Sequence, residues 1–176
     1  MAKRTHVSRP ITRKEQRCGA FRAGTWAYVI WQCTWGLPQT LLGAVLFLLN
    51  RRRCPVRWYH GAVVTEWQAE MSASFGMFVF VTAHPTRDRR RQGRIPVFQL
   101  KQCLLVHEYG HTIQSLFFGP LYLPLMAIPS AAWGYLPYFR RKRERGAAYS
   151  DFFTESLANR LGEWVTGERS LQGALL

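Results

Sequence analysis

The residues with the clearest capacity for chemistry lie in the segment LLVHEYGHTIQS, residues 104–115, which contains the pattern HExxH at 107–111. Two residues four positions apart lie on one face of an α-helix, about one turn from each other. Two neutral imidazoles at this spacing, from His107 and His111, can bind one zinc ion. Glu108 stands beside the first histidine and can take a proton from water at an open metal position. The pattern predicts a zinc site with Glu108 as the general base on zinc-bound water.

A hydrolytic zinc site needs a third protein ligand. The acidic residues that follow the motif are Glu144, Asp151, Glu155, Glu163 and Glu168. We favour Glu155, because Asn159 follows it by one helical turn and Ala158 is small enough to let two helices pack closely. Glu144 lies in a basic stretch that would pair with it, and Asp151 suits a helix cap. Asn159 is then predicted to hydrogen-bond a metal-ligating histidine.

Two helices must position these residues. The first is predicted over residues 99–117, where apolar residues precede and follow the motif. Gly110 within it leaves room for a backbone or a substrate to approach the metal. The second is predicted over residues 151–165, DFFTESLANRLGEWV, with Asp151 as its N-cap.

Strands are predicted between the N-terminal part of the chain and the motif helix. Residues 57–67 and 74–82 are rich in β-branched and aromatic residues, and a polar stretch separates them. Residues 94–98, RIPVF, suggest a short further strand that Pro96 would confine to a sheet edge. Strands and helices in this order predict an α+β fold.

The segment 119–139 is uncharged but contains four prolines. It cannot form one straight helix, because proline breaks the ladder of helical hydrogen bonds. We expect bent apolar segments packed on the core or part-buried in lipid, with a helix that begins at Ser130. The following RRKRERG, residues 140–146, is predicted to be a basic loop.

Residues 25–50 carry no formal charge and are long enough for one bilayer crossing. Trp26, Trp31 and Trp35 are typical of a membrane interface. Gly36 and Pro38 permit a bend, so the segment predicts either one crossing or two half-helices in one leaflet.

The chain has 24 Lys and Arg against 10 Asp and Glu, which gives a net charge of +14. Its basic blocks adjoin long apolar runs, as charge next to a membrane does, and no nucleic-acid-binding motif is present. We therefore expect an anionic lipid membrane and no nucleic acid as partner, with the basic flanks and the site on the cytoplasmic side of the cell membrane. None of the four cysteines lies in a CxxC pair, so we expect reduced or buried thiols.

HEYGH followed by TESLAN resembles the gluzincin branch of the zincin metallopeptidases, over about residues 95–162. The resemblance implies His107, His111 and Glu155 as ligands of Zn²⁺ and Glu108 as the base; Asn159 stands where that family has aspartate. It also implies a zincin-like fold: a small antiparallel sheet, the HExxH helix and a ligand-bearing C-terminal helix. A strand such as GMFVFV would be the edge that pairs with an extended substrate. The longer pattern also resembles small bacterial HExxH proteins.

The expected organisation is a basic, disordered arm at 1–24, a transmembrane or re-entrant segment at 25–50, and a metallopeptidase domain at 51–176 with a second apolar segment at about 112–139. The favoured function is a membrane-associated zinc metallopeptidase that hydrolyses a peptide or protein substrate. Tyr109, Tyr149 and His84 are candidate donors to its oxyanion. Two alternatives are a non-catalytic zinc-stabilised membrane scaffold and a basic nucleic-acid-binding protein whose HExxH arose by chance. The oligomeric state has no signature in the sequence.

Overall fold

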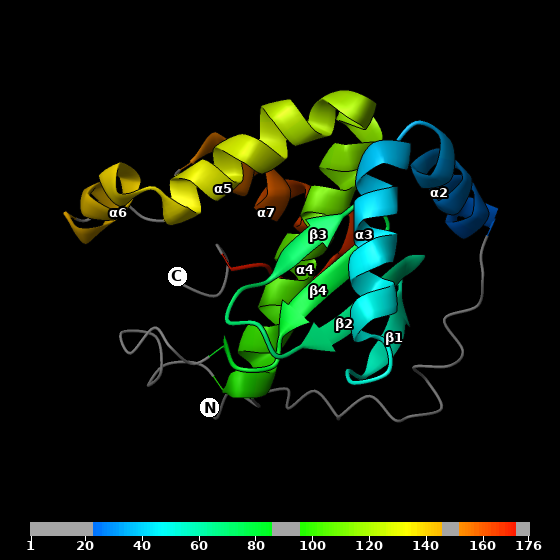
Figure 1. The fold of residues 1–176 in the computed structure, drawn as a ribbon, viewed down its shortest axis with the longest axis horizontal. Helices are drawn as coiled ribbons and strands as arrows, with labels where there is room; N and C mark the ends of the chain where they lie inside the picture. Colours follow the sequence, from blue (N-terminus) through cyan, green and yellow to red (C-terminus); the bar gives the residue numbers. More distant parts are fainter. Residues whose placement is uncertain (1–22, 86–95, 146–151, 172–176) are drawn as a thin grey trace, which may run out of the picture.

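The computed structural model describes residues 23–85, 96–145 and 152–171, and Figure 1 shows their arrangement. The elements in chain order are α2 (Ala23–Thr34), α3 (Leu37–Asn50), β1 (Val56–Tyr59), β2 (Ala62–Trp67), β3 (Ala73–Phe75), β4 (Phe78–Thr82), α4 (Val97–Phe118), η2 (Gly119–Leu121), η3 (Leu123–Ala127), α5 (Ile128–Tyr135), α6 (Pro137–Glu144) and α7 (Phe153–Thr166). The α+β class is as predicted. Almost all of the predicted arm at 1–24, together with Tyr149 and Asp151, lies outside the described residues.

The sheet is mixed, and the predicted antiparallel sheet is wrong in this respect. Its order is β1-β2-β4-β3, with β2 and β4 parallel and the two outer pairs antiparallel. β4 reads FVFVT, an unbroken apolar run rather than an alternating one, and its last four residues are buried. Such a run favours a strand covered on both faces. β4 therefore takes an inner place, and the chain reaches it through the short edge strand β3.

Two tight turns set the register of the outer strands. His60 and Gly61 join β1 to β2 with positive φ of 47° and 90°. Positive φ at both central residues is the geometry that suits the twist of a two-residue hairpin. Gly76 has a φ of 57° between β3 and β4. These turns place β1 and β3 at opposite edges.

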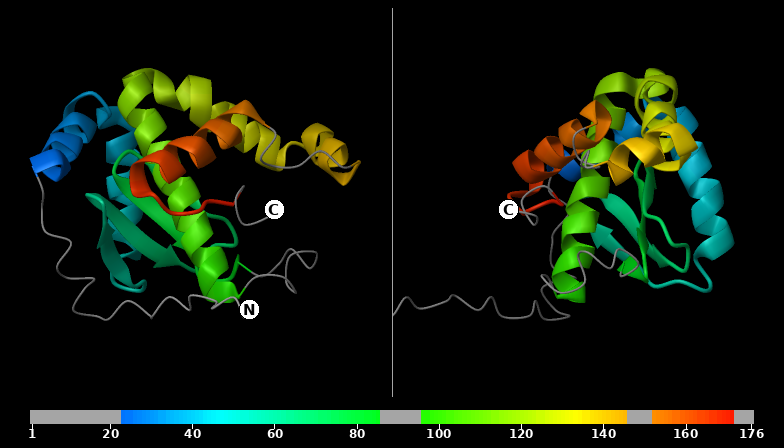
Figure 2. Two further views of the ribbon diagram at one scale, coloured as in Figure 1. Left: turned by 180° about the vertical axis from the view of Figure 1, so that it is seen from behind. Right: turned by 90° about the vertical axis from the view of Figure 1, so that its left-hand side faces the viewer.

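The sheet lies between α3 on one face and α4 on the other, and α7 crosses α4 on the side away from the sheet (Figures 1 and 2). Leu105, Tyr109 and Ile113 of α4 pack in one cluster with Val79 and Val81 of β4. On the other face Phe47 contacts Phe78, with ring centroids 5.4 Å apart. The motif helix is thus held by apolar burial along most of its length.

The predicted N-terminal apolar segment folds as two helices. α2 and α3 meet at an angle of 97°, and Gly36 lies at the break. Among the described residues no single helix has the length and apolarity for a membrane span, whereas this bent pair meets both conditions when taken together. The predicted bend is therefore observed, while the choice between one crossing and two half-helices in one leaflet stays a prediction. Pro38 lies in the first turn of α3 rather than in a helix interior.

The inner side of α2 and α3 combines apolar contacts from Tyr28, Val29 and Phe47 with buried glutamines. Gln32 Nε2 donates to the Thr112 carbonyl at 2.9 Å, and Gln39 Nε2 donates to Ser115 Oγ at 2.8 Å. Both glutamines are 0% exposed. The outer face is apolar; its exposed residues are Trp26, Ile30, Trp31, Trp35, Leu37, Leu41, Leu42, Val45, Leu48 and Leu49. We call these ten residues the apolar outer face.

The proline-rich segment bends as predicted, but its helices differ from those predicted. After α4 the chain passes through the 3-10 turn η2 and the π-turn η3 before α5 begins at Ile128, not at Ser130. Residues 137–144 form helix α6, so most of the predicted basic loop is helical. The predicted short strand at 94–98 is also wrong, because Val97 and Phe98 begin α4. Pro96 at the N-cap needs no backbone donor there, which suits a helix start.

Candidate metal centre

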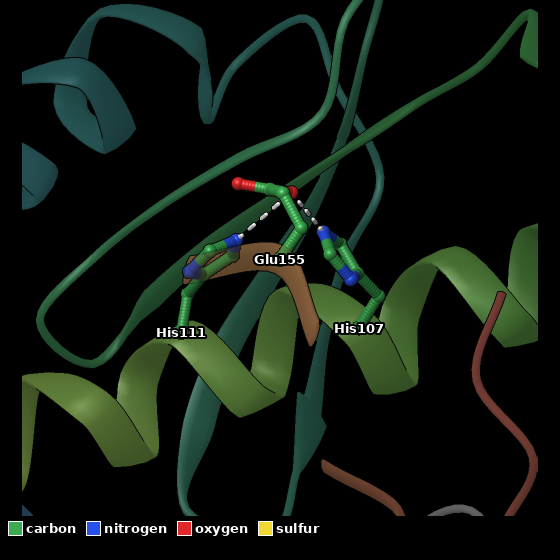
Figure 3. Close-up of side chains that lie close together, drawn as sticks. All are labelled: His107, His111 and Glu155. Carbon is green, nitrogen blue, oxygen red and sulfur yellow. Dashed lines mark ion pairs between the residues drawn. The ribbon is translucent and has the colours of Figure 1, made fainter. Parts of the chain in front are cut away.

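Figure 3 shows three side chains that converge from two helices: His107 and His111 from α4 and Glu155 from α7. Their candidate ligand atoms all lie within 4.8 Å of one another, and all three residues are buried. His107 Nε2 lies 3.1 Å from Glu155 Oε2, and His111 Nε2 lies 3.7 Å from the same oxygen. A tetrahedral zinc ion with ligands at about 2.0–2.1 Å separates them by about 3.3 Å. The spacing therefore fits a small divalent ion.

Small residues let α7 approach α4 closely enough for the three side chains to converge. A Cβ on Gly110 would lie 1.8 Å from the Ala158 carbonyl oxygen, and one on Gly162 would lie 2.2 Å from the Val106 carbonyl oxygen. The two backbones are thus in direct contact at the crossing. The space predicted at Gly110 is used by the backbone of α7, and Ala158 lies at the contact as predicted.

Hydrogen bonds fix the orientation of both imidazoles. His107 Nδ1 lies 2.8 Å from Asn159 Oδ1, and His111 Nδ1 lies 2.8 Å from Gln114 Oε1. The Gln114 amide has its orientation set from the other side, because its Nε2 donates to the Thr154 carbonyl at 2.7 Å. His111 Nδ1 must then carry the hydrogen. In a neutral ring that leaves the lone pair on Nε2, which faces Glu155.

The remaining carboxylate oxygen has no donor of its own. Glu155 Oε1 accepts from Ser130 Oγ at 2.5 Å and from Thr154 Oγ1 at 3.1 Å. Glu155 Oε2 is buried and makes no hydrogen bond of normal geometry, although two ring nitrogens face it. With neutral imidazoles, three lone pairs point at one another. Such an arrangement is costly unless a cation or an added proton lies between them.

In the metal-free site, a proton can occupy the position between these three atoms. Burial would lower the pKa of His111, but the Glu155 carboxylate beside its ring raises it to about 9. Burial would likewise raise the pKa of Glu155, yet the two histidines hold it well below its usual range. Both shifts describe a carboxylate that requires positive charge beside it. The first turn of α7 adds the positive end of its helix dipole.

Glu108 faces the same space as the three converging side chains. It lines a cavity of about 580 Å³ together with His107, His111 and Glu155. Its carboxyl is only 6% exposed, and burial raises its pKa above the ordinary value, with the charge of Glu155 acting in the same direction. A raised pKa suits a group that exchanges protons near neutral pH.

The strand beside this cavity is β3, not the predicted GMFVFV. Residues 71–75 form one wall of the cavity. β4 pairs with neighbours on both sides, so it offers no free edge for a further strand. η3 and α5 form the opposite wall, and stacking of Trp133 on Phe152, with centroids 5.0 Å apart, holds α5 against the start of α7.

Neither of the two predicted oxyanion donors that the structure describes lines the cavity. The Tyr109 hydroxyl donates to the His60 carbonyl at 3.0 Å, and His84 is exposed and pairs with Gln68 at 3.0 Å. Tyr149 lies outside the described residues. The tyrosines that line the cavity are Tyr122 and Tyr135. The proline-rich segment has no hydrophobic periodicity from which the position of these two tyrosines could have been predicted.

Of the other candidate ligands, the two whose side chains the structure describes lie elsewhere. Glu163 accepts from the Ser170 backbone and hydroxyl, and Glu168 accepts from Gln102. Sequence reasoning missed Gln114 and Ser130, which hold His111 and Glu155 in place. Gln114 had a signal, since a residue three positions after a helical histidine lies on the same face. Ser130 had none, because its contact joins two segments 25 residues apart.

The fold and site define an α+β protein with a buried candidate metal centre of two histidines and one glutamate. No model of a protein family matches this chain, and neither a curated protein nor a solved structure matches it.

Proposed function

We propose that this protein is a membrane-associated, zinc-dependent metallopeptidase. The observation that carries the proposal is the convergence of three unsatisfied lone pairs, from His107, His111 and Glu155, at the floor of a cavity that Glu108 also lines. A donor set of two imidazoles and one carboxylate leaves a tetrahedral ion one further position, which is the arrangement of hydrolytic zinc sites. A bound zinc ion supplies a Lewis acid that polarises a carbonyl and lowers the pKa of water.

The chain's own residues then perform the proton transfers. Glu108 takes a proton from the attacking water, whose oxygen forms a bond to the carbonyl carbon of the peptide. The carbon–nitrogen bond breaks, and Glu108 returns the proton to the leaving nitrogen. The products are a carboxylate and a protonated amine, so one water molecule is consumed. Asn159 and Gln114 keep the two imidazoles in the tautomer that presents Nε2.

The metal assignment is tested with full-length protein in detergent. We expect about one zinc per chain, lost in Glu155→Ala and retained in Glu108→Gln. Glu163→Gln is a matched control, because Glu163 lies on the same helix and serves only the Ser170 contact among the interactions described. Zinc content is measured by atomic emission after dialysis against metal-free buffer. Stoichiometric zinc in Glu155→Ala would remove the proposed ligand set.

The catalytic assignment is tested with the same variants and a mixture of unlabelled peptides, followed by mass spectrometry. We expect wild-type protein to release cleaved products and zinc-loaded Glu108→Gln to release none, with a fall of at least about 10²-fold for loss of a general base. Retained turnover in that variant would show that another group acts as the base. A zinc-loaded wild type that cleaves no peptide would favour the scaffold function.

The membrane assignment is supported by the apolar outer face of α2 and α3. Ten large apolar side chains on the apolar outer face are costly in water and favourable in lipid, while the buried glutamines bond to α4. Arg51, Arg52 and Arg53 are exposed directly after α3, where they can meet anionic headgroups.

Membrane association is tested by flotation with vesicles. We expect binding to vesicles that contain phosphatidylserine, weakened by Val45→Glu on the apolar outer face. Val56→Glu is the control, since Val56 is an exposed valine on β1, away from that face. Protein that stays with the soluble fraction in all conditions would contradict membrane association.

A further inference from the structure

The walls of the cavity above His107 and His111 carry no formal charge. Residues 71–75 form one wall, and η3 with α5 form the other. The apolar side chains that line them are Met71, Phe75, Leu123, Ala127, Ile128 and Ala131. Among the described lining residues, the ionisable acids and bases other than tyrosine are the four at the floor, although the whole chain has a net charge of +14.

Most wall hydroxyls are already engaged within the protein. Ser72 Oγ accepts from the Thr82 backbone at 3.1 Å, and the Tyr135 hydroxyl donates to Met71 Sδ at 2.5 Å across the cavity. Ser130 donates to Glu155. A charged substrate side chain would therefore lose its water without gaining a counter-charge from these walls, which is strongly unfavourable.

No Lys or Arg is among the described residues that line the cavity. Arg51, Arg52, Arg53 and Arg57 are exposed near the end of α3 and on β1, and Lys101 pairs with Glu66 on β2. None of them lines the cavity. The positive charge is thus placed to meet an anionic surface and not an acidic substrate.

One wall hydroxyl, that of Ser74, has no hydrogen bond of normal geometry. Ser74 lies on β3 and lines the cavity, and it is 6% exposed. Glu108 and Tyr122 lie near it, but its hydroxyl makes no hydrogen bond of normal geometry. A buried hydroxyl without a partner suits the N–H or C=O of a peptide group that enters beside it.

The rim of the cavity continues into exposed apolar surface. Met71, Ile128 and Tyr135 line the cavity and are 41%, 63% and 60% exposed. The neighbouring Leu121 and Leu125 of the same proline-rich segment are exposed as well. Just before Leu121, Gly119 contacts the ring of Trp35, a member of the apolar outer face at the bend between α2 and α3. Figure 1 shows α5 extending from this bend across the molecule.

From these observations we infer that the substrate is an uncharged, apolar stretch of polypeptide that reaches the cavity along the apolar outer face. This inference rests on the proposed metallopeptidase function. The walls recognise apolar side chains, Ser74 meets the backbone, and the rim connects the cavity to lipid. Such a stretch can come from a membrane-anchored polypeptide or from a free apolar peptide, and we assign the anchored source.

Binding and hydrolysis are measured separately, so that the substrate class is judged apart from catalysis. Peptides of one sequence differ at a single central residue, which is Leu, Phe, Asp or Lys. Binding is measured by fluorescence anisotropy on zinc-loaded Glu108→Gln, and hydrolysis on zinc-loaded wild type. We expect the Leu and Phe peptides to bind at least tenfold more tightly than the Asp and Lys peptides, and to be cleaved at least tenfold faster.

A charge placed on the wall should change this preference. Ala131 lines the cavity and is exposed, so a longer side chain can be accommodated there. In Ala131→Lys we expect the Asp peptide to gain at least tenfold in binding relative to the Leu peptide. Ala131→Met adds similar bulk without charge and should keep the apolar preference.

The source is tested by attaching the Leu peptide to a transmembrane anchor in vesicles that also hold the enzyme. We expect faster cleavage of the anchored peptide than of the free one at the same total concentration. Equal or slower cleavage would overturn entry along the apolar outer face. Charged peptides that bind as tightly as apolar ones would overturn the substrate class. Failure of all cleavage with normal apolar binding would instead refute the peptidase function and leave the binding preference established.

Discussion

The crossing of α4 with α7 and the contact of α4 with α2 and α3 both bury polar side chains against the same helix, but with different results. Around Gln32 and Gln39 each amide nitrogen donates to an oxygen, and the acceptor left without a partner in the described network, Gln39 Oε1, is neutral. At the other crossing the atom left without a partner is a carboxylate oxygen of Glu155 that faces two ring nitrogens.

This difference separates a structural network from a ligand site. A neutral network in which one acceptor lacks a partner can still hold helices together at a modest cost. A buried carboxylate without a donor is much more costly, and it persists only where something else compensates it. Burial of polar residues on a motif helix therefore does not by itself indicate function; the balance of donors and acceptors does.

Gly110→Ala is the most direct way to disrupt the metal centre without changing a ligand. Its Cβ would lie 1.8 Å from a backbone oxygen of α7, so the two helices must separate. We expect a loss of about 3 kcal/mol in the free energy of unfolding, measured by urea titration, and a loss of zinc binding.

Gly24→Ala is the matched control, because a Cβ on Gly24 meets nothing within 4 Å. In a helix it should be neutral or stabilise the protein by up to about 1 kcal/mol. Normal zinc content in Gly110→Ala would show that the helices need not be in backbone contact to form the site.

The residues that orient the imidazoles should affect metal binding and not folding alone. We expect Asn159→Ala and Gln114→Ala each to weaken zinc affinity by about 10–100-fold, measured by competition with a chelating dye. Gln114→Ala should have the larger effect, since Gln114 also holds the Thr154 carbonyl beside Glu155. An unchanged affinity in both variants would mean that the rings are fixed by packing.

A change in the network around Gln32 and Gln39 should affect folding and not metal binding. Gln32→Leu leaves the Thr112 carbonyl and Ser115 hydroxyl without this partner. We expect a loss of about 1–2 kcal/mol in the free energy of unfolding with zinc stoichiometry unchanged. Loss of zinc in this variant would show that the two regions are coupled through α4.

The pH dependence of the metal-free protein should reveal the proton that substitutes for the ion. The folded pKa of His111, about 9, exceeds its ordinary value of 6.5, so the stabilisation is complete below pH 6.5 and is lost as pH rises through 9. The lowered pKa of Glu155 arises from the same pair, so its stabilising effect begins above pH 4.5 and is lost together with the proton on His111. We expect Tm to fall by a few degrees between pH 6.5 and 9.

Glu155→Gln should remove most of that slope, because the carboxylate is what raises the pKa of His111. Zinc-loaded wild type should show no such fall, since the ion replaces the proton. Scanning calorimetry at several pH values measures both. A metal-free Tm that rises over the same window would contradict the charge balance described for the site.

Hydrophobic periodicity and turn residues were sufficient to predict the elements that depend only on neighbours along the chain. The motif helix was predicted to within two residues at its start and one at its end, because apolar residues on both sides of HExxH mark its period. The bend at Gly36 and the bent course of the proline-rich segment were also visible. The sheet was not: whether β4 pairs parallel with β2 depends on a short strand that inserts at the edge, and β3 has only three residues.

The sequence by itself determined which atoms are available: two imidazoles on one turn of helix, a neighbouring carboxylate, a second helix with an acid and an amide one turn apart, and an apolar N-terminal segment with basic residues after it. Tertiary structure decided where the lone pairs point, that Gln114 and Ser130 complete the surroundings of the site, and that the glutamines of α2 and α3 face inward. The physical reason is that periodicity depends on neighbours along the chain. The balance of donors and acceptors depends on atoms brought together from segments 25 to 80 residues apart.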